Sequence, residues 1–268
     1  MSTHGGRSSW AGGRILEPAV VRRGTLTPVR ARDALKQALR EEFVPTLRAA
    51  GFKGTYPTWR LPAGDAVAVV SIYAGQYNEG TYGTFDVMMA VVTPAWSEWQ
   101  ADDVSGIWGS PTKPGRERYW DGIARLTLTP LTPTNSLYDW MINSVKDAQT
   151  VAHQMTQALN AGQLANLLRL TNPDELLADL TTIANLPPGK VHTYGWQWDY
   201  GPHMALVAHA VLLSDHGGPE LEAACQRLEQ WKDPDPARTQ RPSLLPETAQ
   251  WARDRAARLA EERQSNHH

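Results

Sequence analysis

The first regular pattern of apolar residues in the chain has the spacing of a helix. An apolar residue occupies every fourth position from 35 to 47: Leu35, Leu39, Phe43 and Leu47. Apolar residues at this spacing lie on one face of an α-helix. Thr27 and Pro28 are typical of a helix start and Gly51 of a helix end. The pattern predicts a long helix over residues 28–50, bent at Pro45 because proline cannot donate the helical hydrogen bond.

After Gly51 the apolar spacing changes to two, which is typical of β-strands. Extended patterns occupy residues 58–61, 66–74, 84–93 and 124–129. In the third of these segments, one face carries Phe85, Val87, Met89 and Val91. We expect this face to pack on the long helix. The short connections between the strands favour antiparallel pairing.

From residue 137 onward the patterns are helical again. Helices are predicted over residues 143–168, 173–180, 203–213 and 219–231. A last helix is predicted over residues 244–260, where the apolar stripe consists of Leu245, Ala249, Ala252, Ala256 and Leu259. Such a stripe must be buried, either within this chain or against a partner helix.

Together these patterns predict an α+β fold. We expect a mostly antiparallel four-stranded sheet with the long N-terminal helix packed on one face, followed by a helical C-terminal region. Residues 1–26 are rich in Gly and Ser and lack apolar periodicity, so they are expected to form a mobile basic arm. The α+β domain is expected over residues 27–186 and the helical region over 190–268, because Pro187, Pro188 and Gly189 interrupt the pattern between them.

Composition narrows the choice of environment. The 268 residues are 41% hydrophobic, as in ordinary globular proteins. The longest apolar run, residues 87–92, is too short to span a bilayer. The N-terminus lacks the apolar segment of a signal peptide, so a cytoplasmic protein without membrane contact is expected. The single cysteine, Cys225, excludes an intrachain disulfide and a cysteine-based zinc cage.

Charge gives little support for nucleic-acid binding. The formal net charge is −2, which exerts no overall attraction on polyanions. Six arginines lie between Arg7 and Arg32 against one acid, Glu17. Such a basic arm can contact phosphates, although charges spread this thinly more often keep a tail solvated.

The common catalytic motifs are missing from the sequence. It contains no phosphate-binding P-loop, no dinucleotide-binding glycine fingerprint, no H-E-x-x-H, no G-x-S-x-G and no C-x-x-C. His203 and His209 are six residues apart and would lie on different faces of one helix, so a shared metal is not expected. The sequence therefore predicts no catalytic residue, no metal site and no cofactor, and it favours a non-catalytic protein without deciding the question.

Aromatic residues point to a first candidate surface. The chain has 11 Trp and 8 Tyr but only 3 Phe. Four of these aromatics alternate along one short segment: Tyr194, Trp196, Trp198 and Tyr200. If this segment is extended, all four rings share a face that can stack on sugars, bases or a partner's side chains. Alternatively, the ribbon joins the C-terminal helices to the first domain.

A second candidate surface combines two loops. The segment 76–83 between two predicted strands carries Gln76, Asn78 and Tyr82. The long loop over residues 101–119 and the positions next to it supply Lys113, Arg116, Arg118, Tyr119 and Trp120. With Arg60 they can form a polar cleft for an anionic group, because loops on a rigid sheet often carry binding residues. An ordinary hairpin loop is the alternative.

Two stretches carry a family resemblance. They are LREEFVPTLRAAGFKGTYPTWRL and AVVSIYAGQYNEGTYGTFDVMMAVV, followed by Tyr138, Asp139 and Trp140. They resemble the bacterial family catalogued as domain of unknown function 4304 over about residues 30–180. The matching positions are Gly51, Phe52, Trp59, Arg60, Gln76, Asn78 and Phe85. The chain departs from the family in the long 101–119 loop. The resemblance implies no activity, but domains of this kind often occur beside toxin or defence genes.

Three functional hypotheses follow. The first is a non-catalytic cytoplasmic protein-interaction module, of bacterial immunity or phage-defence type, with a protein partner or a second copy bound through the 244–260 helix. The second is an enzyme or small-ligand-binding protein whose cleft lies near Tyr82, Arg116 and Arg118, with Tyr82 or Asp86 as acid or base. The third, nucleic-acid binding through the basic arm, has the least support.

Overall fold

An antiparallel sheet forms the centre of the fold. The structure is a computed structural model that describes residues 30–74, 82–102, 112–132, 140–186, 203–232 and 244–266. Within them the sheet has six strands: β1 (Lys53–Thr55), β2 (Thr58–Ala63), β3 (Ala66–Ala74), β4 (Gly83–Val92), β5 (Ala124–Thr127) and β6 (Trp140–Ile142). Their order is β1-β2-β3-β4-β5, and β6 also pairs with β4. All of these pairings are antiparallel.

The α+β class and the antiparallel sheet are thus confirmed, but the prediction of four strands is wrong. The two additional strands, β1 and β6, have three residues each. A period of two cannot be recognised over so few positions, and both strands are held by their neighbours in the sheet. Gly54 pairs with Trp59 across β1 and β2, and Phe85 pairs with Trp140 across β4 and β6.

The predicted single N-terminal helix is two helices, α1 (Ala31–Glu41) and α2 (Phe43–Ala49). The break falls at Glu42, where φ is −108°. Pro45 accounts for it, because proline has no N–H to donate to the carbonyl of residue 41 and its ring crowds that carbonyl. Where the sequence predicted a bend in one helix, the structure therefore has two separate helices.

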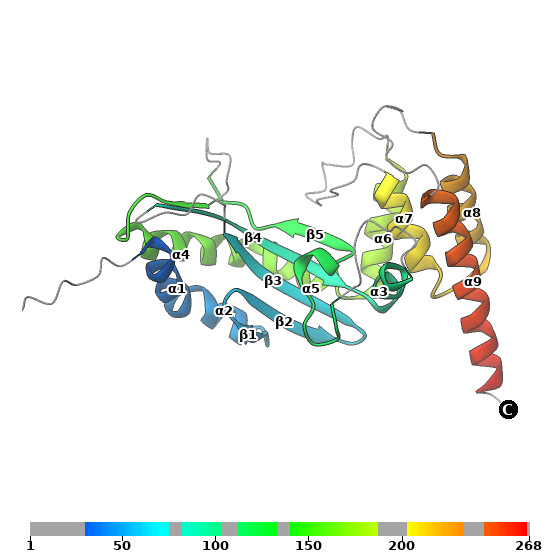
Figure 1. Cartoon of the computed structure of the whole chain (residues 1–268), viewed down its shortest axis with the longest axis horizontal. Coiled ribbons are helices and arrows are strands. Elements are labelled where there is room, and N and C mark those ends of the chain that lie inside the picture. The colour runs from blue at the N-terminus through cyan, green and yellow to red at the C-terminus, as the bar shows by residue number, and fades with distance from the viewer. Residues whose placement is uncertain are drawn as a thin grey trace, which may run out of the picture.

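The apolar stripe of these two helices is buried in the core that the sheet lines. Leu35, Leu39, Phe43 and Leu47 are at most 3% exposed, and they share one core with the β4 residues Phe85, Val87, Met89 and Val91. Phe43 also meets Trp59 of β2 edge to face, with ring centroids 6.1 Å apart. This packing fixes α1 and α2 above the β1–β2 edge of the sheet (Figure 1).

A second helical segment lies beside α1 and α2. It begins with α4 (Asp147–Ala158) and continues through a turn of π-helix, η2 (Leu159–Gln163), into α5 (Leu164–Arg169). The predicted helix over residues 143–168 is interrupted at Gly162, where φ is +106°. Glycine adopts this conformation at little cost.

The opposite face of the sheet carries a small second core. Val69, Ala90 and Val92 are buried there, with Tyr119 packed against them. Tyr119 opens the short helix η1 (Tyr119–Asp121). A Cβ at Gly122 would lie 2.6 Å from the Cβ of Ala90, so the loop approaches the sheet as closely as glycine permits.

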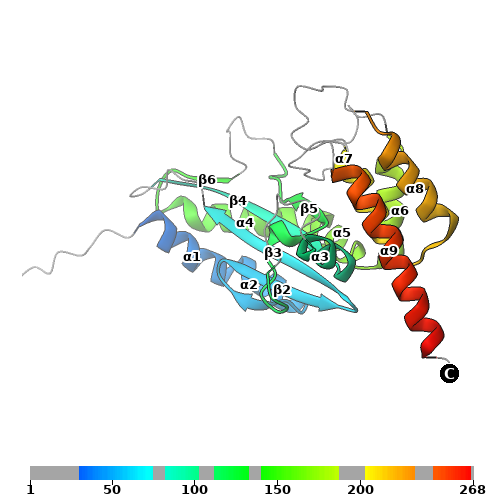
Figure 2. The same ribbon diagram turned by 45° about the vertical axis from the view of Figure 1, so that its right-hand side comes forward.

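The remaining helices gather at one end of the sheet (Figures 1 and 2). They are α3 (Pro94–Ala101), α6 (Pro173–Ala184), α7 (His203–Leu213), α8 (Gly218–Gln230) and α9 (Leu244–Ser265). The helix α3 was not predicted; the Thr93 side chain caps it and Pro94 stands at its first turn. Trp99 of α3 donates its indole N–H to Thr248 of α9 at 3.2 Å. The C-terminal helices are therefore joined directly to the sheet domain.

The apolar stripe of the last helix is buried within the chain. Leu245, Ala249 and Ala252 are at most 6% exposed, and Ala256 packs against the same core. Helix α9 contacts both α7 and α8. No helix among the described residues is long and apolar enough to cross a membrane. The basic arm and the expected domain boundary at 187–189 lie outside the described residues, so the division into domains stays a prediction.

Candidate functional site

The predicted polar cleft is only partly assembled among the described residues. Arg60 reaches the long loop, where its Nε donates to the Glu117 carbonyl at 2.7 Å and lies 3.5 Å from the Glu117 carboxylate. Arg118 stacks on Trp120, with its guanidinium carbon 4.9 Å from the ring centroid. Arg116 is exposed on the same loop. Arg60 is thus used to hold the loop, and no contact among the described residues joins it to Arg116 or Arg118.

Tyr82 lies elsewhere on the sheet. It precedes β4, beside the β6 pairing of Gly83 with Ile142. The loop is joined to the other end of β4, where Ile123 donates to the Val91 carbonyl. Tyr119 of the same loop also packs edge to face on Tyr73, with ring centroids 6.1 Å apart, and Tyr73 pairs with Asp86 of β4, so the loop reaches along the sheet toward the Tyr82 end. The remaining predicted surface residues, Gln76, Asn78, Tyr194, Trp196, Trp198 and Tyr200, lie outside the described residues.

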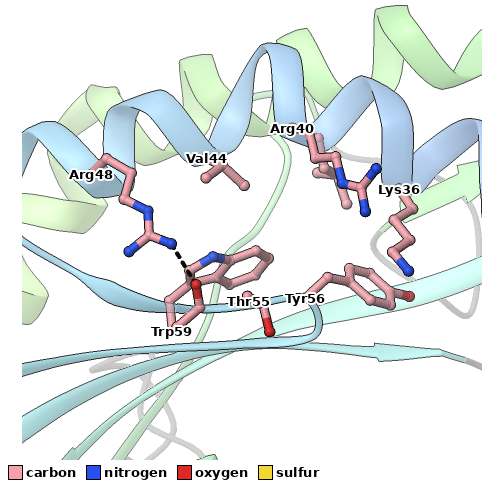
Figure 3. Close-up of a pocket in the computed structure, with 9 residues that line it drawn as sticks. Lys36, Arg40, Val44, Arg48, Thr55, Tyr56 and Trp59 are labelled. Atoms are coloured by element: carbon pink, nitrogen blue, oxygen red, sulfur yellow. Dashed lines mark hydrogen bonds between the residues drawn. The ribbon is translucent and has the colours of Figure 1, made fainter.

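A pocket that sequence reasoning did not find lies between α1–α2 and the β1–β2 edge. It encloses about 350 Å³. The helices contribute Lys36, Leu39, Arg40, Val44 and Arg48, and the strands with their connection contribute Gly54, Thr55, Tyr56 and Trp59. Figure 3 shows the side chains of Lys36, Arg40, Val44 and Arg48 extending from the helices toward the strands. Three of these nine residues are cationic and none is acidic.

The three cations occupy two ends of this basic pocket. At one end, Lys36 and Arg40 extend over Tyr56 (Figure 3), and the Lys36 ammonium lies 5.8 Å from the Tyr56 ring centroid. At the other end, Arg48 donates from Nη1 to the Phe52 carbonyl at 2.9 Å and from Nη2 to the Gly54 carbonyl. Arg48 therefore anchors the β1 edge to α2.

Lys36 and Arg40 are not neutralised by the part of the chain that the structure describes. Neither forms an ion pair or a hydrogen bond there through its side chain, in contrast to Arg169, Arg253 and Arg255. The two cations stand four residues apart on α1, so they lie side by side on one flank of the helix and repel each other. An anion placed between them would relieve that repulsion.

The base of the pocket is apolar and rigid. Leu39 and Trp59 are each 1% exposed, so they form a closed base rather than a contact surface. Gly54 shapes the wall: its φ is +123°, and a Cβ there would lie 2.5 Å from the Thr58 carbonyl oxygen. Only glycine fits this conformation and this space. The base and the Gly54 wall of the pocket are thus fixed by packing and backbone geometry, whereas Arg40 and Thr55 line it as exposed side chains.

A pattern of charges in the sequence is consistent with this pocket. Cations recur at steps of four beside the apolar stripe of the helix: Arg32, Lys36 and Arg40, with Val44 and then Arg48 continuing the same row. Positions four apart advance only about 40° around a helix, so each member of the row lies beside the next, one turn further along. The sequence could not show which strands would close the other side, because that depends on the three-residue strand β1.

A separate polar cluster lies between α6, α7 and α8. His209 is 4% exposed; its Nδ1 is 3.1 Å from Arg227 Nη2 and its Nε2 is 3.0 Å from Thr181 Oγ1. Because arginine can only donate, Nδ1 must be the acceptor and the imidazole is neutral. Burial, together with the Arg227 charge, lowers the pKa of His209 from 6.5 to about 4. This cluster joins α6, α7 and α8.

The single cysteine is also a packing residue. Cys225 is fully buried, and its thiol donates to the Ala249 carbonyl at 3.4 Å. Burial raises the pKa of this thiol to about 11, which disfavours the reactive thiolate. Within the described residues, no group of three or more His, Cys, Asp or Glu side chains is arranged to hold a metal ion.

Comparison with known families places part of this site in a recognised domain. Residues 43–169 match a family described as Domain of unknown function (DUF4304). The predicted resemblance is confirmed over these residues. The DUF4304 match, just under half of the chain, includes Arg48 and the whole strand side of the pocket, whereas Lys36 and Arg40 precede it. Comparisons with curated proteins and with solved structures find no match.

Proposed function

We propose that this protein is a non-catalytic interaction module that binds an anionic group of a protein partner in the basic pocket. The observation that carries the proposal is the pair Lys36 and Arg40, two neighbouring cations that face a preformed pocket with no acid among its nine lining residues. A rigid pocket with uncompensated charge favours binding of the opposite charge, because little has to be reorganised when the ligand enters.

The pocket is better suited to recognition than to bond-making chemistry. Its polar side chains are three permanent cations, a hydroxyl and a phenol, a set that positions an anion. The alternative cleft near Arg116 and Arg118 has less support, because among the described residues no contact joins Tyr82 to either arginine, and Arg118 stacks on Trp120. The cytoplasmic location and the immunity or phage-defence role stay predictions.

The partner is assigned to the pocket rather than to the last helix. Of the apolar stripe of α9, which the sequence offered to a partner or a second copy, Leu245, Ala249 and Ala252 are buried in a helix that contacts α7 and α8, and Leu259 is partly buried. The pocket instead has free charge and open space. An exposed acidic or modified side chain on another protein fits it, whereas a second apolar helix does not.

The experiment that tests this proposal is affinity capture from the native host with matched variants. Lys36→Met with Arg40→Met removes the two pocket charges. Arg32→Met with Lys53→Met is the control, since it removes one arginine and one lysine that are exposed next to the pocket but do not line it.

The proposal predicts a specific protein retained by the wild type and by the control, and lost from the pocket variant. Recovery of the same proteins by all three chains, or of none by the wild type, would show the proposal to be wrong. Far-UV circular dichroism of the three chains establishes that each is folded.

A further inference from the structure

We propose that the anionic group is a phosphate carried by an aromatic ring, in the form of a phosphotyrosine side chain on the partner. This inference rests on the proposed function and specifies its ligand. It follows from three properties of the basic pocket: its charge, the geometry of its cations, and the apolar space between its two ends.

Charge is the first argument. Lys36 and Arg40 are both unpaired within the described residues, and Arg48 adds a third positive charge at the far end. A carboxylate carries one negative charge, whereas a phosphate monoester carries about −1.5 to −2 at neutral pH. Two adjacent uncompensated cations therefore match a phosphate better than a single carboxylate.

Geometry is the second argument. Lys36 and Arg40 extend from neighbouring turns of α1 on the same side of the pocket, with the Lys36 ammonium 5.8 Å from the Tyr56 ring centroid (Figure 3). The planar guanidinium of arginine binds two phosphate oxygens at once, and the lysine ammonium serves the remaining oxygen as a compact charge.

Space is the third argument. A volume of about 350 Å³ is far more than a bare phosphate fills. It falls at the small end of the range for ligand pockets, roughly 300–1,000 Å³. Besides the cations, the pocket is lined by Tyr56, which lies beneath Lys36, and by Val44, above a base in which Trp59 is 1% exposed. Aromatic rings pack edge to face or offset against one another, so a phenyl ring suits this lining better than the short stem of a phosphoserine.

The test is fluorescence anisotropy with labelled peptides of one sequence. Its central residue is phosphotyrosine, tyrosine, phosphoserine or glutamate, and a single-stranded RNA oligomer serves as a separate probe. The phosphotyrosine peptide should bind at least about tenfold more tightly than each of the other peptides, a difference well outside experimental scatter. Lys36→Met with Arg40→Met should abolish that preference, and Arg32→Met with Lys53→Met should retain it.

The pH profile supplies a second readout. The phosphate gains its second negative charge near pH 6, so the affinity of the phosphotyrosine peptide should rise between pH 5 and 7. The glutamate peptide should show no such rise, because its carboxylate is already ionised. A purely structural role of the two cations would not produce this difference.

Two outcomes would overturn the inference. Equal affinity for the glutamate and phosphotyrosine peptides would make the pocket a carboxylate site, which removes the phosphate but leaves the proposed interaction module in place. Preferential RNA binding that falls equally in both double variants would show a diffuse attraction for polyanions, and it would remove the proposed function as well.

Discussion

His209 of α7 accepts a hydrogen bond from Arg227 of α8 through Nδ1 at 3.1 Å, in a site where the imidazole is 4% exposed. The other ring nitrogen, Nε2, lies 3.0 Å from the Thr181 hydroxyl, which itself donates to the Leu177 carbonyl at 2.8 Å. Every contact of the ring therefore suits the neutral form, and protonation would turn an N–H toward a guanidinium.

This contact predicts that the protein loses stability in mild acid. The pKa of His209 is about 4 in the folded chain and near 6.5 when exposed, so the unfolded state binds more protons between these values. The free energy of unfolding should be insensitive to this group above about pH 7. It should fall by on the order of 3 kcal/mol as the pH falls from about 6.5 to 4.

Urea titrations across this pH range measure the effect. His209→Gln should reduce the slope of the free energy of unfolding against pH, because glutamine does not titrate. The matched control is His153→Gln, since His153 is 57% exposed in its contact with Glu42. Equal slopes in the wild type and His209→Gln would mean that the imidazole is not held neutral.

The contacts of Arg255 of α9 join the C-terminal helices to the sheet domain. Arg255 is 5% exposed and donates from Nε to Glu98 of α3 at 2.7 Å and from Nη1 to Asp215 at 2.6 Å. Arg255→Met should lower the free energy of unfolding by about 2 kcal/mol, because buried hydrogen bonds to charged groups are lost. Arg258→Met is the control: Arg258 contacts the same Glu98 at 3.2 Å but is 54% exposed.

An exposed ion pair contributes about 1 kcal/mol or less, so the control should change stability little. Chemical denaturation with tryptophan fluorescence is a suitable readout, because Trp99 and Trp251 both lie at this junction. Similar losses for the two variants would place the stabilising contact on Glu98 in general rather than on the buried guanidinium.

Substitution of Gly54 tests whether the wall of the pocket is rigid. Gly54→Ala combines a φ of +123° with a Cβ 2.5 Å from the Thr58 carbonyl oxygen. We expect a loss of about 3 kcal/mol, because steric overlap adds to the cost of the backbone conformation. Gly64→Ala is the control, with a φ of +59° and no atom within 4 Å of the added Cβ.

The control should lose only about 1 kcal/mol, the cost of the left-handed conformation itself. Thermal unfolding of both variants provides the comparison. If Gly54→Ala were as stable as Gly64→Ala, the β1 edge would be able to move away from the Thr58 carbonyl and the pocket wall would not be rigid.

Local pattern was sufficient for the long elements and insufficient for the short ones. Strand β3 occupies residues 66–74 and α7 residues 203–213, as their apolar patterns predicted. Strands β1 and β6 have three residues each, too few to show a period of two, and their existence depends on hydrogen bonds to β2 and β4. The apolar spacing from Leu35 to Leu47 runs on without interruption, so the sequence pattern predicted one helix where the structure has α1 and α2.

The pocket escaped prediction for a related reason. The cationic row of Lys36, Arg40 and Arg48 is visible in the sequence, but a row of charges on a helix usually faces water. What makes it a pocket is Tyr56 and Gly54 lying opposite, and their position is set by the pairing of β1 with β2. Aromatic composition directed attention to Trp120 and the 194–200 segment instead.

Removing the pocket charges should leave the fold intact or strengthen it. Like charges four residues apart on a helix destabilise it by about 0.2–0.5 kcal/mol, and Lys36 and Arg40 are such a pair. Lys36→Met with Arg40→Met should therefore unfold at an equal or slightly higher urea concentration than the wild type, while losing its ligand. Residues that a protein retains at a cost in stability are typical of binding sites.

The measurement is urea denaturation of the double variant, of Arg32→Met with Lys53→Met, and of Arg48→Met. The last should lose about 1–2 kcal/mol, because its hydrogen bonds to the Phe52 and Gly54 carbonyls are part of the fold. A comparable loss in the Lys36 and Arg40 variant would mean that these two cations also hold the structure together. Their charge would then need no ligand to explain it, and the case for a binding pocket would lose its central observation.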